Sequence, residues 1–379
     1  MIARHFVPPY RVLLGPGPSE VSARVLLAMA QPTIGHLDPL FIGMMEEVKG
    51  LLQYVFKTAN ALTLPISAPA SAGMEACLAN IVEPGDEVAV CRNGVFGGRM
   101  AEIVRRVGGK PVLVDNAFGE AVDPHKLEDA LKKHPGVRIV AFVHAETSTG
   151  VLSDAKTLTE VAHRFDCLVV ADVVTSLGGV PVLVDEWDID VAYAGTQKCL
   201  SCPPGLSPLT VNARAIEKMR ARREKPRTWF LDLDLLMSYW GTGTRAYHHT
   251  APINLLYALH EALVMLAEEG LENAWARHRR VHDRFVEGME TLGLQMAVPA
   301  DIRLPELNSV LVPTGIDEAR FRGDLLTHWG IEIGAGLGEL AGRIWRVGLM
   351  GFGCQERNVV LCLAGFKDAL ARQGFVGGA

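Results

Sequence analysis

Two charged residues stand where predicted buried strands end, and their chemistry is complementary. Asp172 is the only charge in the apolar stretch from Cys167 to Val184, where an unpaired carboxylate would cost several kcal/mol. Lys198 follows Gly195 and other small residues, which leave room for a bulky carbonyl compound to reach the amine and form a Schiff base. Such a pair offers one group for a pyridine nitrogen and one for an aldehyde. The alternatives are an Asp that caps a loop and a Lys on the surface.

The stretches that would position these residues alternate between strands and helices. Short apolar runs predict seven strands, at 62–67, 87–91, 111–115, 138–144, 167–172, 190–194 and 206–211. Helical patterns lie between the first five of them, at 73–82, 96–107, 123–134 and 154–165. This alternation predicts an α/β fold with a mostly parallel sheet of about seven strands, covered by helices on both faces. In such sheets, function lies beyond the carboxyl ends of the strands.

The sequence pattern changes after residue 250. Long helical patterns at 251–269 and 271–291 lead into short strands near 308–312, 331–333 and 344–348, and a last helix begins near 355. We therefore expect a smaller C-terminal α+β domain. The expected division is an N-terminal segment over 1–20, a large cofactor-binding domain over 21–265 and a small domain over 266–379.

Composition narrows the functional class. The 379 residues include 37 Lys and Arg and 43 Asp and Glu, a formal net charge of −6, which argues against nucleic acid or an acidic membrane as a partner. A hydrophobic fraction of 49% excludes disorder. The most membrane-like stretch, 167–184, contains Asp172 and Pro181, so a buried strand explains it better than a membrane span. Seven cysteines in no framework spacing favour a reduced, cytoplasmic protein.

A series of short stretches resembles a known family, in the family's order and over nearly the whole chain. These stretches are Leu14-Gly-Pro-Gly-Pro-Ser19, Gly35-His36, Gly73-Met-Glu-Ala76, Pro84-Gly-Asp86, Asn93-Gly-Val-Phe-Gly97, His144-Ala-Glu-Thr-Ser-Thr-Gly150, Ala171-Asp172, Ser176-Leu-Gly-Gly179, Gly195-Thr-Gln-Lys198, Pro203-Pro-Gly205, Tyr247-His-His-Thr250, Gly334-Ala-Gly-Leu-Gly338 and Arg346-Val-Gly348. The chain resembles the class V, fold-type I pyridoxal-phosphate aminotransferases, in the alanine/serine–glyoxylate (serine–pyruvate) group. The resemblance implies pyridoxal 5'-phosphate as the cofactor and no metal.

The resemblance also implies roles for individual residues. Lys198 would form the aldimine with the cofactor and move a proton, and Asp172 would pair with the pyridine nitrogen. The residues implied to bind the cofactor are Ala70, Ser71, Phe96, Thr147, Asp172, Val174, Gln197 and Lys198, with Tyr247 and Thr250 supplied by a neighbouring subunit. The substrate would meet Gly35 and Arg346, the latter through a bidentate fork on its carboxylate. The implied assembly is therefore a homodimer with shared active sites.

The implied reaction is a ping-pong transfer through the Lys198 aldimine, from a small amino acid (serine or alanine) to a small 2-oxo acid (glyoxylate or pyruvate).

The loop Pro69-Ala70-Ser71 departs from the Ser-Gly-His or Ser-Gly-Thr of the group, and a proline donates no N–H. Pyridoxamine–pyruvate aminotransferase is the first alternative, but its loop glutamate has no counterpart here and Leu337 stands at the position of its second arginine. After the histidine of Gly35-His36, Leu37 stands where many bacterial members have arginine. Another fold-type I enzyme, a lyase or desulfurase, is the second alternative.

Other patterns point to weaker hypotheses. The run Gly334-x-Gly-x-Gly338 precedes a strand, which disfavours a nicotinamide dehydrogenase. His278 and His282 have a spacing that can hold zinc, but a solvated helix face is the preferred interpretation.

Cys199 and Cys202 are expected to be spectators. A desulfurase would need a mobile cysteine, and its candidates Cys354 and Cys362 stand near or in the last helix. A protein that binds the cofactor without catalysis remains open, although the presence of Lys198 and Asp172 argues against it.

Overall fold

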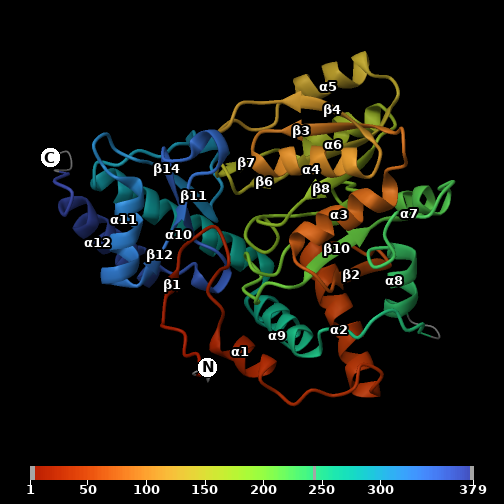
Figure 1. The fold of residues 1–379 in the computed structure, drawn as a ribbon, viewed down its shortest axis with the longest axis horizontal. Helices are drawn as coiled ribbons and strands as arrows, with labels where there is room; N and C mark the ends of the chain where they lie inside the picture. Colours follow the sequence, from red (N-terminus) through yellow and green to blue (C-terminus); the bar gives the residue numbers. More distant parts are fainter. Residues whose placement is uncertain (1–4, 242–244, 376–379) are drawn as a thin grey trace, which may run out of the picture.

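The computed structural model describes residues 5–241 and 245–375. Its largest sheet consists of β2 (Leu62–Ile66), β3 (Glu87–Arg92), β4 (Lys110–Asp115), β5 (Val137–Val143), β8 (Leu168–Asp172), β9 (Val191–Tyr193) and β10 (Ser207–Val211). The strand order is β2-β10-β9-β8-β5-β3-β4, and within this sheet β10 alone runs against its neighbours (Figure 1). The predicted α/β fold with a mostly parallel sheet of seven strands is confirmed.

Helices cover both faces of this sheet. Every residue of β2, β9 and β10 is buried, and successive side chains of a strand point to opposite faces. The helices of this unit are α1 (Ala23–Met29), α2 (Pro39–Phe56), α3 (Ala70–Ile81), α4 (Val95–Arg106), α5 (Pro124–Lys133), α6 (Ala155–Arg164), α7 (Ala213–Arg220), α8 (Leu233–Trp240) and α9 (Ile253–Glu269). Helices α1, α2, α7 and α8 have no counterpart among the predicted elements, although the buried residues of α2 recur every three or four positions as an amphipathic helix requires.

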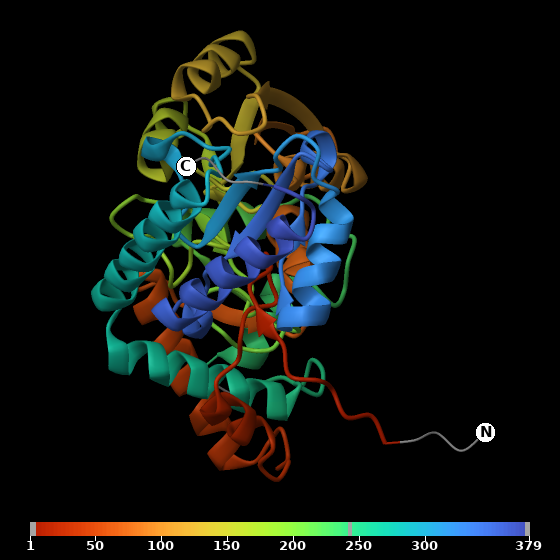
Figure 2. The same ribbon diagram turned by 90° about the vertical axis from the view of Figure 1, so that its left-hand side faces the viewer.

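The second unit has its own hydrophobic core. Its sheet has the order β11-β14-β13, formed by β11 (Leu307–Leu311), β13 (Gly334–Ala335) and β14 (Ile344–Gly348). Its helices are α10 (Leu271–Thr291), α11 (Glu318–Asp324) and α12 (Glu356–Ala371), with α12 between the other two (Figure 2). The ring of Trp345 stacks on Phe321 at 4.0 Å and meets Phe366 edge-on. These aromatic contacts hold the sheet against α11 and α12.

The N-terminal segment joins this second unit before the chain enters α1. Strand β1 (Val12–Leu13) pairs in parallel with β12 (Ile331–Glu332), and Val12 and Leu14 pack into the second core (Figure 1). Helix α10 bridges the two cores, because Leu271 packs on the first core and Phe285 on the second. The exact division into domains stays a prediction.

Short elements complete the chain. They are the hairpin strands β6 (Ala145–Glu146) and β7 (Val151–Leu152), the 3-10 turns Ala300–Ile302, Gly338–Leu340 and Gly351–Gly353, and the π-helical turn Leu325–Trp329. Within the described ranges, no helix is both long and apolar enough to cross a membrane.

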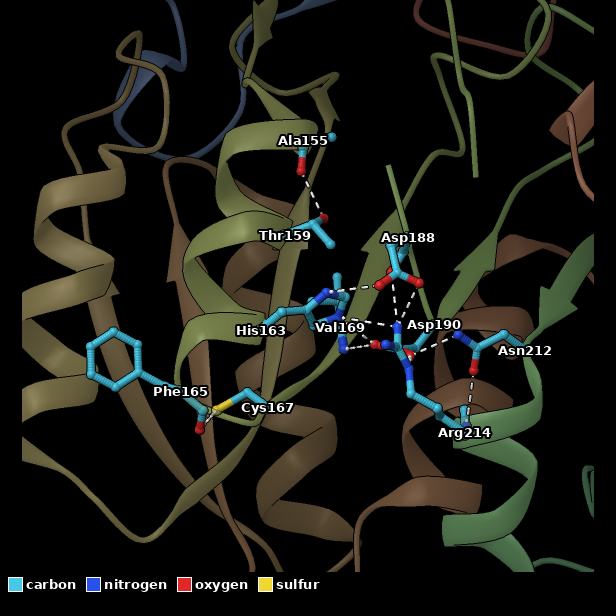
Figure 3. Close-up of polar contacts among 11 residues, drawn as sticks. Ala155, Thr159, His163, Phe165, Cys167, Val169, Asp188, Asp190, Asn212 and Arg214 are labelled. Carbon is cyan, nitrogen blue, oxygen red and sulfur yellow. Dashed lines mark hydrogen bonds and ion pairs between the residues drawn. The ribbon is translucent and has the colours of Figure 1, made fainter. Parts of the chain in front are cut away.

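The amino end of β9 is tied to its surroundings by Asp190 (Figure 3). This buried carboxylate accepts hydrogen bonds from His163 of α6, from the N–H of Val169 in β8, and from Asn212 and Arg214 beside α7, at 2.8–3.1 Å. Burial raises the pKa of Asp190, but these hydrogen bonds together hold it below its usual value. The cluster lies at the edge of the sheet opposite the carboxyl ends, so we assign it a structural role.

The histidine pair on α10 corrects one sequence expectation. His278 and His282 are buried, not solvated. The Nε2 atom of His278 accepts the N–H of Gly351 at 2.9 Å, and the Nδ1 atom of His282 lies 2.7 Å from the Oδ1 atom of Asn308. The two side chains therefore fasten α10 to the turn at Gly351 and to strand β11. In the described part of the chain, no group of three potential ligands could hold a metal ion.

Glu306 is a buried carboxyl behind the loop that follows Lys198. It is fully buried, and neither of its oxygens finds a hydrogen-bond partner among the described residues. A Cβ atom on Gly179 would lie 2.8 Å from its Oε1 atom and 2.7 Å from the Sγ atom of Cys199, so the glycine permits this close approach. Burial raises the pKa of Glu306 to about 8.

We expect Glu306→Gln to stabilise the protein progressively as the pH rises. An unfolded glutamate has a pKa of about 4.3, so between about pH 4 and 8 the folded protein holds a proton that the unfolded chain has lost. The stability of the native protein must therefore fall through this window, whereas glutamine carries no such proton. In urea titrations, the free energy of unfolding of Glu306→Gln minus that of the native protein should increase by roughly 2–4 kcal/mol between about pH 5 and pH 9. A gap that does not change with pH, or an equal change in the exposed control Glu290→Gln, would contradict this expectation.

Candidate active site

A cavity lies beyond the carboxyl ends of the sheet. It collects eight residues that the sequence singled out: Ala70, Ser71, Phe96, Thr147, Asp172, Val174, Gln197 and Lys198. They come from segments that follow β2, β3, β5, β8 and β9 and lie far apart in the sequence. Six further residues line the same cavity: Pro69, Met74, Arg99, Val143, Ala145 and Tyr193.

Asp172 is the last residue of β8 and is buried. Its Oδ2 atom accepts the hydroxyl of Tyr193 at 2.7 Å, and its Oδ1 atom accepts the N–H of Val174 at 2.9 Å. Burial raises its pKa to about 6, against the effect of these two hydrogen bonds. The carboxylate forms no ion pair within the described residues, so its site would gain most from a cation brought in by a ligand.

Lys198 lies in the loop after β9, where it is buried against the N-terminal segment. Its Nζ atom donates a hydrogen bond to the carbonyl of Pro16. Gly17 has φ +101°, and a Cβ there would lie 2.9 Å from the Cδ atom of Lys198, so only glycine fits this contact. The hydroxyl of Ser19 donates to the carbonyl of Lys198 at 2.7 Å. Burial, with the charge of Arg346, lowers the pKa of Lys198 to about 8, which leaves part of the amine neutral and nucleophilic near pH 7.

The N-terminus of α3 opens toward the cavity without a cap. Pro69 holds the N-cap position and makes no side-chain hydrogen bond, and Ala70 already belongs to the first turn, three residues earlier than predicted. Uncapped N–H groups at a helix N-terminus attract an anion. The guanidinium of Arg99 donates to the hydroxyl of Ser71 at 3.1 Å beside this helix end, and the side-chain amide of Gln197 lines the same cavity. Together these groups form an anion-binding corner.

Phe96 forms the aromatic wall of the cavity from the first turn of α4. The guanidinium of Arg99, one turn further along this helix, lies 4.9 Å from the centre of its ring. A cation on one face of the ring leaves the other face for a flat ligand.

Arg346 lies on β14, deep between the two units. It is 6% exposed, yet it forms no ion pair within residues 5–241 and 245–375. Its Nε atom donates to the carbonyl of Ala335 at 2.7 Å, and its Nη1 atom to the carbonyl of Thr147 at 3.0 Å. Burial lowers its pKa to about 10, so the side chain stays charged at neutral pH. A buried guanidinium fixed by two carbonyls is suited to bind a carboxylate.

Four sequence candidates do not line this cavity in their own chain: Gly35, Tyr247, Thr250 and Arg346, of which Arg346 is linked to the cavity wall by its hydrogen bond to the carbonyl of Thr147. Gly35 is exposed, with no atom within 4 Å of a Cβ placed on it. Tyr247 is 62% exposed, with its ring 5.4 Å from that of His36 and its hydroxyl 3.3 Å from that of Thr250. Tyr247 and Thr250 therefore point to solvent or to another subunit.

Several residues of the site were not among the candidates. Tyr193 bonds Asp172, Pro16 and Gly17 contact Lys198, and Arg99 completes the anion-binding corner. The stretch Leu14-Gly-Pro-Gly-Pro-Ser19 offered a weak signal, because two Gly-Pro pairs stand ahead of any predicted element and mark a tight turn. Arg99 and Tyr193 carried no local signal.

All seven cysteines are free and buried. Burial raises the pKa of Cys202 and of Cys354 to about 12 and that of Cys362 further still, so none of these three is a ready nucleophile. Burial also raises the pKa of Cys199 well above its usual value. The absence of an exposed thiol argues against a desulfurase.

The comparisons with known proteins agree with this geometry. The family model "Aminotransferase class-V" matches residues 21–339. The chain is 39% identical to the alanine–glyoxylate aminotransferase of Mus musculus over 96% of this chain and 88% of that protein, and 38% identical to the (S)-ureidoglycine–glyoxylate transaminase of Bacillus subtilis (strain 168) over 97% and 92%. A solved structure of an alanine–glyoxylate aminotransferase from Nostoc sp. superposes with a TM-score of 0.96 at 44% identity, covering 98% of each chain. The chain belongs to the class V aminotransferase family and is a transaminase.

Proposed function

We propose that this protein uses pyridoxal 5'-phosphate to move an amino group from a small amino acid, serine or alanine, to a small 2-oxo acid, glyoxylate or pyruvate, by a ping-pong mechanism. The observation that supports this most is that Lys198 and Asp172 line one cavity, while Arg346 is bonded to the carbonyl of Thr147 in the wall of the same cavity. Each of the three is buried and, within the described residues, none has an ion-pair partner. The names of the relatives add glyoxylate as the acceptor.

The residues present fit the cofactor. The uncapped N-terminus of α3, the side-chain N–H of Gln197 and Arg99 would hold its phosphate. Phe96 would cover its ring, and Asp172 would pair with its ring nitrogen. When bound, this cofactor withdraws electrons from the Cα atom of an amino acid attached to it. Pro69 leaves the N-terminus of α3 without a side-chain cap, so the phosphate would depend on backbone N–H groups and on Arg99.

Lys198 and Arg346 would divide the work on the substrate. The Nζ atom of Lys198 would bond to the cofactor's aldehyde and, once the donor's amine displaces it, would take the proton from the donor's Cα atom as a neutral amine. Its lowered pKa suits it to this role near neutral pH. Arg346 would hold the substrate carboxylate and so fix the Cα–H bond next to Lys198.

Pyridoxamine–pyruvate transfer is not favoured by any contact of the cavity. The 69–71 loop contains no glutamate, and Leu337 is 37% exposed where a second substrate arginine would be needed. A lyase without transamination would show a different product balance, so the test below distinguishes it.

A half-reaction screen tests the function. Purified protein should carry a yellow chromophore that borohydride reduces, and a true donor should bleach it until an acceptor restores it. The screen should offer alanine, serine, glycine, aspartate, (S)-ureidoglycine and pyridoxamine as donors, and glyoxylate and pyruvate as acceptors. Bleaching by alanine or serine with recovery in glyoxylate would support the proposal. A protein without the chromophore, or one that responds only to pyridoxamine, would overturn it.

We also propose that the active protein is a homodimer whose sites take Tyr247 and Thr250 from the partner. The support is that both residues lie outside the cavity of their own chain, and Tyr247 is exposed. In a hybrid of one Lys198→Ala chain and one Tyr247→Phe, Thr250→Ala chain, one site is doubly altered and the other is intact. A refolded equal mixture should therefore recover roughly a quarter of the native activity, well above either parent. Activity equal to the mean of the parents would contradict sharing. A cytoplasmic location stays a prediction.

A further inference from the structure

Helix α4 presents Phe96 to the cavity, yet its N-terminus has no cap from its own sequence. The N-cap residue Gly94 has no side chain. The caps come from the end of β6 and the turn after it: the N–H of Val95 donates to Ser148 Oγ at 2.9 Å, and the N–H of Phe96 donates to Glu146 Oε2 at 3.2 Å. The aromatic wall of the site is thus held by a carboxylate some fifty residues away in sequence.

Glu146 is locked into this arrangement. It is fully buried, and its other oxygen, Oε1, accepts the N–H of Ser148 at 3.0 Å and the hydroxyl of Ser148 at 2.6 Å. A Cβ atom on Gly94 would lie 2.4 Å from the Cγ and Cδ atoms of Glu146, so the glycine is needed for the carboxylate to reach the helix. A negative group at a helix N-terminus is also favoured by the helix dipole.

The same turn holds the opposite side of the site. Thr147, the residue after Glu146, lines the cavity, and its carbonyl accepts the guanidinium of Arg346. The hydroxyl of Ser309 in β11 donates to the carbonyl of Thr149 at 2.8 Å, which fastens the turn to the second unit. One tight turn therefore contacts the ring-covering residue, the cavity wall and the residue suited to bind the substrate carboxylate.

We propose that Glu146 is a positioning residue, which caps α4 in order to hold Phe96 against the cofactor ring while its turn holds Thr147 and Arg346. This inference rests on the proposed function. It adds a residue that touches neither cofactor nor substrate and acts through those that do. The buried carboxylate is required because its two oxygens accept three hydrogen bonds from two different segments.

The test compares Glu146→Gln with the native protein in cofactor binding. Glutamine has the same size, but one of its two terminal groups donates instead of accepting, so either Phe96 or Ser148 loses its acceptor. With the cofactor removed and added back, we expect the Kd for pyridoxal 5'-phosphate to rise by about tenfold, the effect of one unmet buried N–H. The visible circular dichroism of the bound cofactor should also shrink, because it reports the orientation of the ring.

A matched control is Asp154→Asn. Asp154 caps α6 with the same pair of bonds, from the N–H of Thr157 at 3.0 Å and its hydroxyl at 2.6 Å, but it does not line the cavity. This variant should lose thermal stability and bind the cofactor as the native protein does. Ser148→Ala is the second test variant. It keeps the charge of Glu146, frees the N–H of Val95, and should weaken cofactor binding in the same direction.

The outcomes are distinct. Weakened binding and reduced dichroism in Glu146→Gln and Ser148→Ala, with both properties unchanged in Asp154→Asn, support the positioning role. The positioning role is overturned if Ser148→Ala and the folded fraction of Glu146→Gln both bind the cofactor with native affinity and native dichroism. It is also overturned if Asp154→Asn weakens cofactor binding as much as they do. A native protein that forms no chromophore with the cofactor overturns the proposed function and this inference together, whereas native-like variants overturn the inference alone.

Discussion

Replacing Lys198 by alanine is expected to lower turnover by at least about 10³-fold, the effect of losing both a covalent nucleophile and a proton acceptor. The borohydride-reducible chromophore should disappear as well, because no other lysine of the described residues lines the cavity. The fold should survive, since burial already disfavours the charge on Lys198 and lowers its pKa to about 8. Single-turnover absorbance measurements and a thermal unfolding curve on the same sample test the two expectations together.

The control for this variant is Lys367→Ala, which removes an exposed lysine of α12 and should change neither the spectrum nor the turnover. Normal transamination by Lys198→Ala would refute the role of Lys198. Loss of activity with an equal loss of folded protein would show that the lysine is structural.

Changing Asp172 to asparagine is expected to reduce turnover by about 10²–10⁴-fold, because removing one partner of a buried ion pair costs roughly 3–5 kcal/mol. The charge of Asp172 is the only anion that the cavity lining offers to a ring nitrogen. Asparagine keeps the shape and still accepts from Tyr193 or from Val174, so the protein should fold. The measurement is the rate of the first half-reaction with saturating donor, together with the position of the cofactor absorbance band.

Asp190→Asn provides the matched control, since Asp190 is equally buried but lies at the opposite edge of the sheet. It should lower the free energy of unfolding by at least about 2 kcal/mol through its charged hydrogen bonds and leave the half-reaction of the folded protein unchanged. Equal half-reaction rates in Asp172→Asn and the native protein would refute the pairing with the ring nitrogen.

The charged residues of the site share one energetic feature. Asp172, Lys198 and Arg346 are each buried against the pull of solvation, and within the described residues each relies on hydrogen bonds in place of an opposite charge. The unfavourable desolvation is offset only when ligands bring their own charges. Burial accordingly shifts the pKa of each of these three residues toward its neutral form, whereas the hydrogen bonds of Asp190, including the one from Arg214, hold its pKa below the usual value without a ligand.

The sequence by itself determined the large sheet and most of the residues around its cavity. Strands such as 167–172 are visible because a strand buried on both faces is a short apolar run, and Asp172 stands out because a lone charge in such a run needs a partner. The predicted strands agree with the seven observed strands to within one residue at either end, and eight candidates line the cavity. The signals for the strands, for Asp172 and for Lys198 are local, whereas the other six candidates were implied by the resemblance to the family.

Only the tertiary structure decided the contacts between distant segments. The reversed direction of β10, the pairing of β1 with β12, and the burial of His278 and His282 depend on which surfaces meet. The hydrogen bond from Lys198 to Pro16 and the capping of α4 by Glu146 belong to the same class, because the sequence around each residue does not identify its partner. A local pattern reports how a residue is buried, whereas its partner is chosen by packing that involves the whole chain.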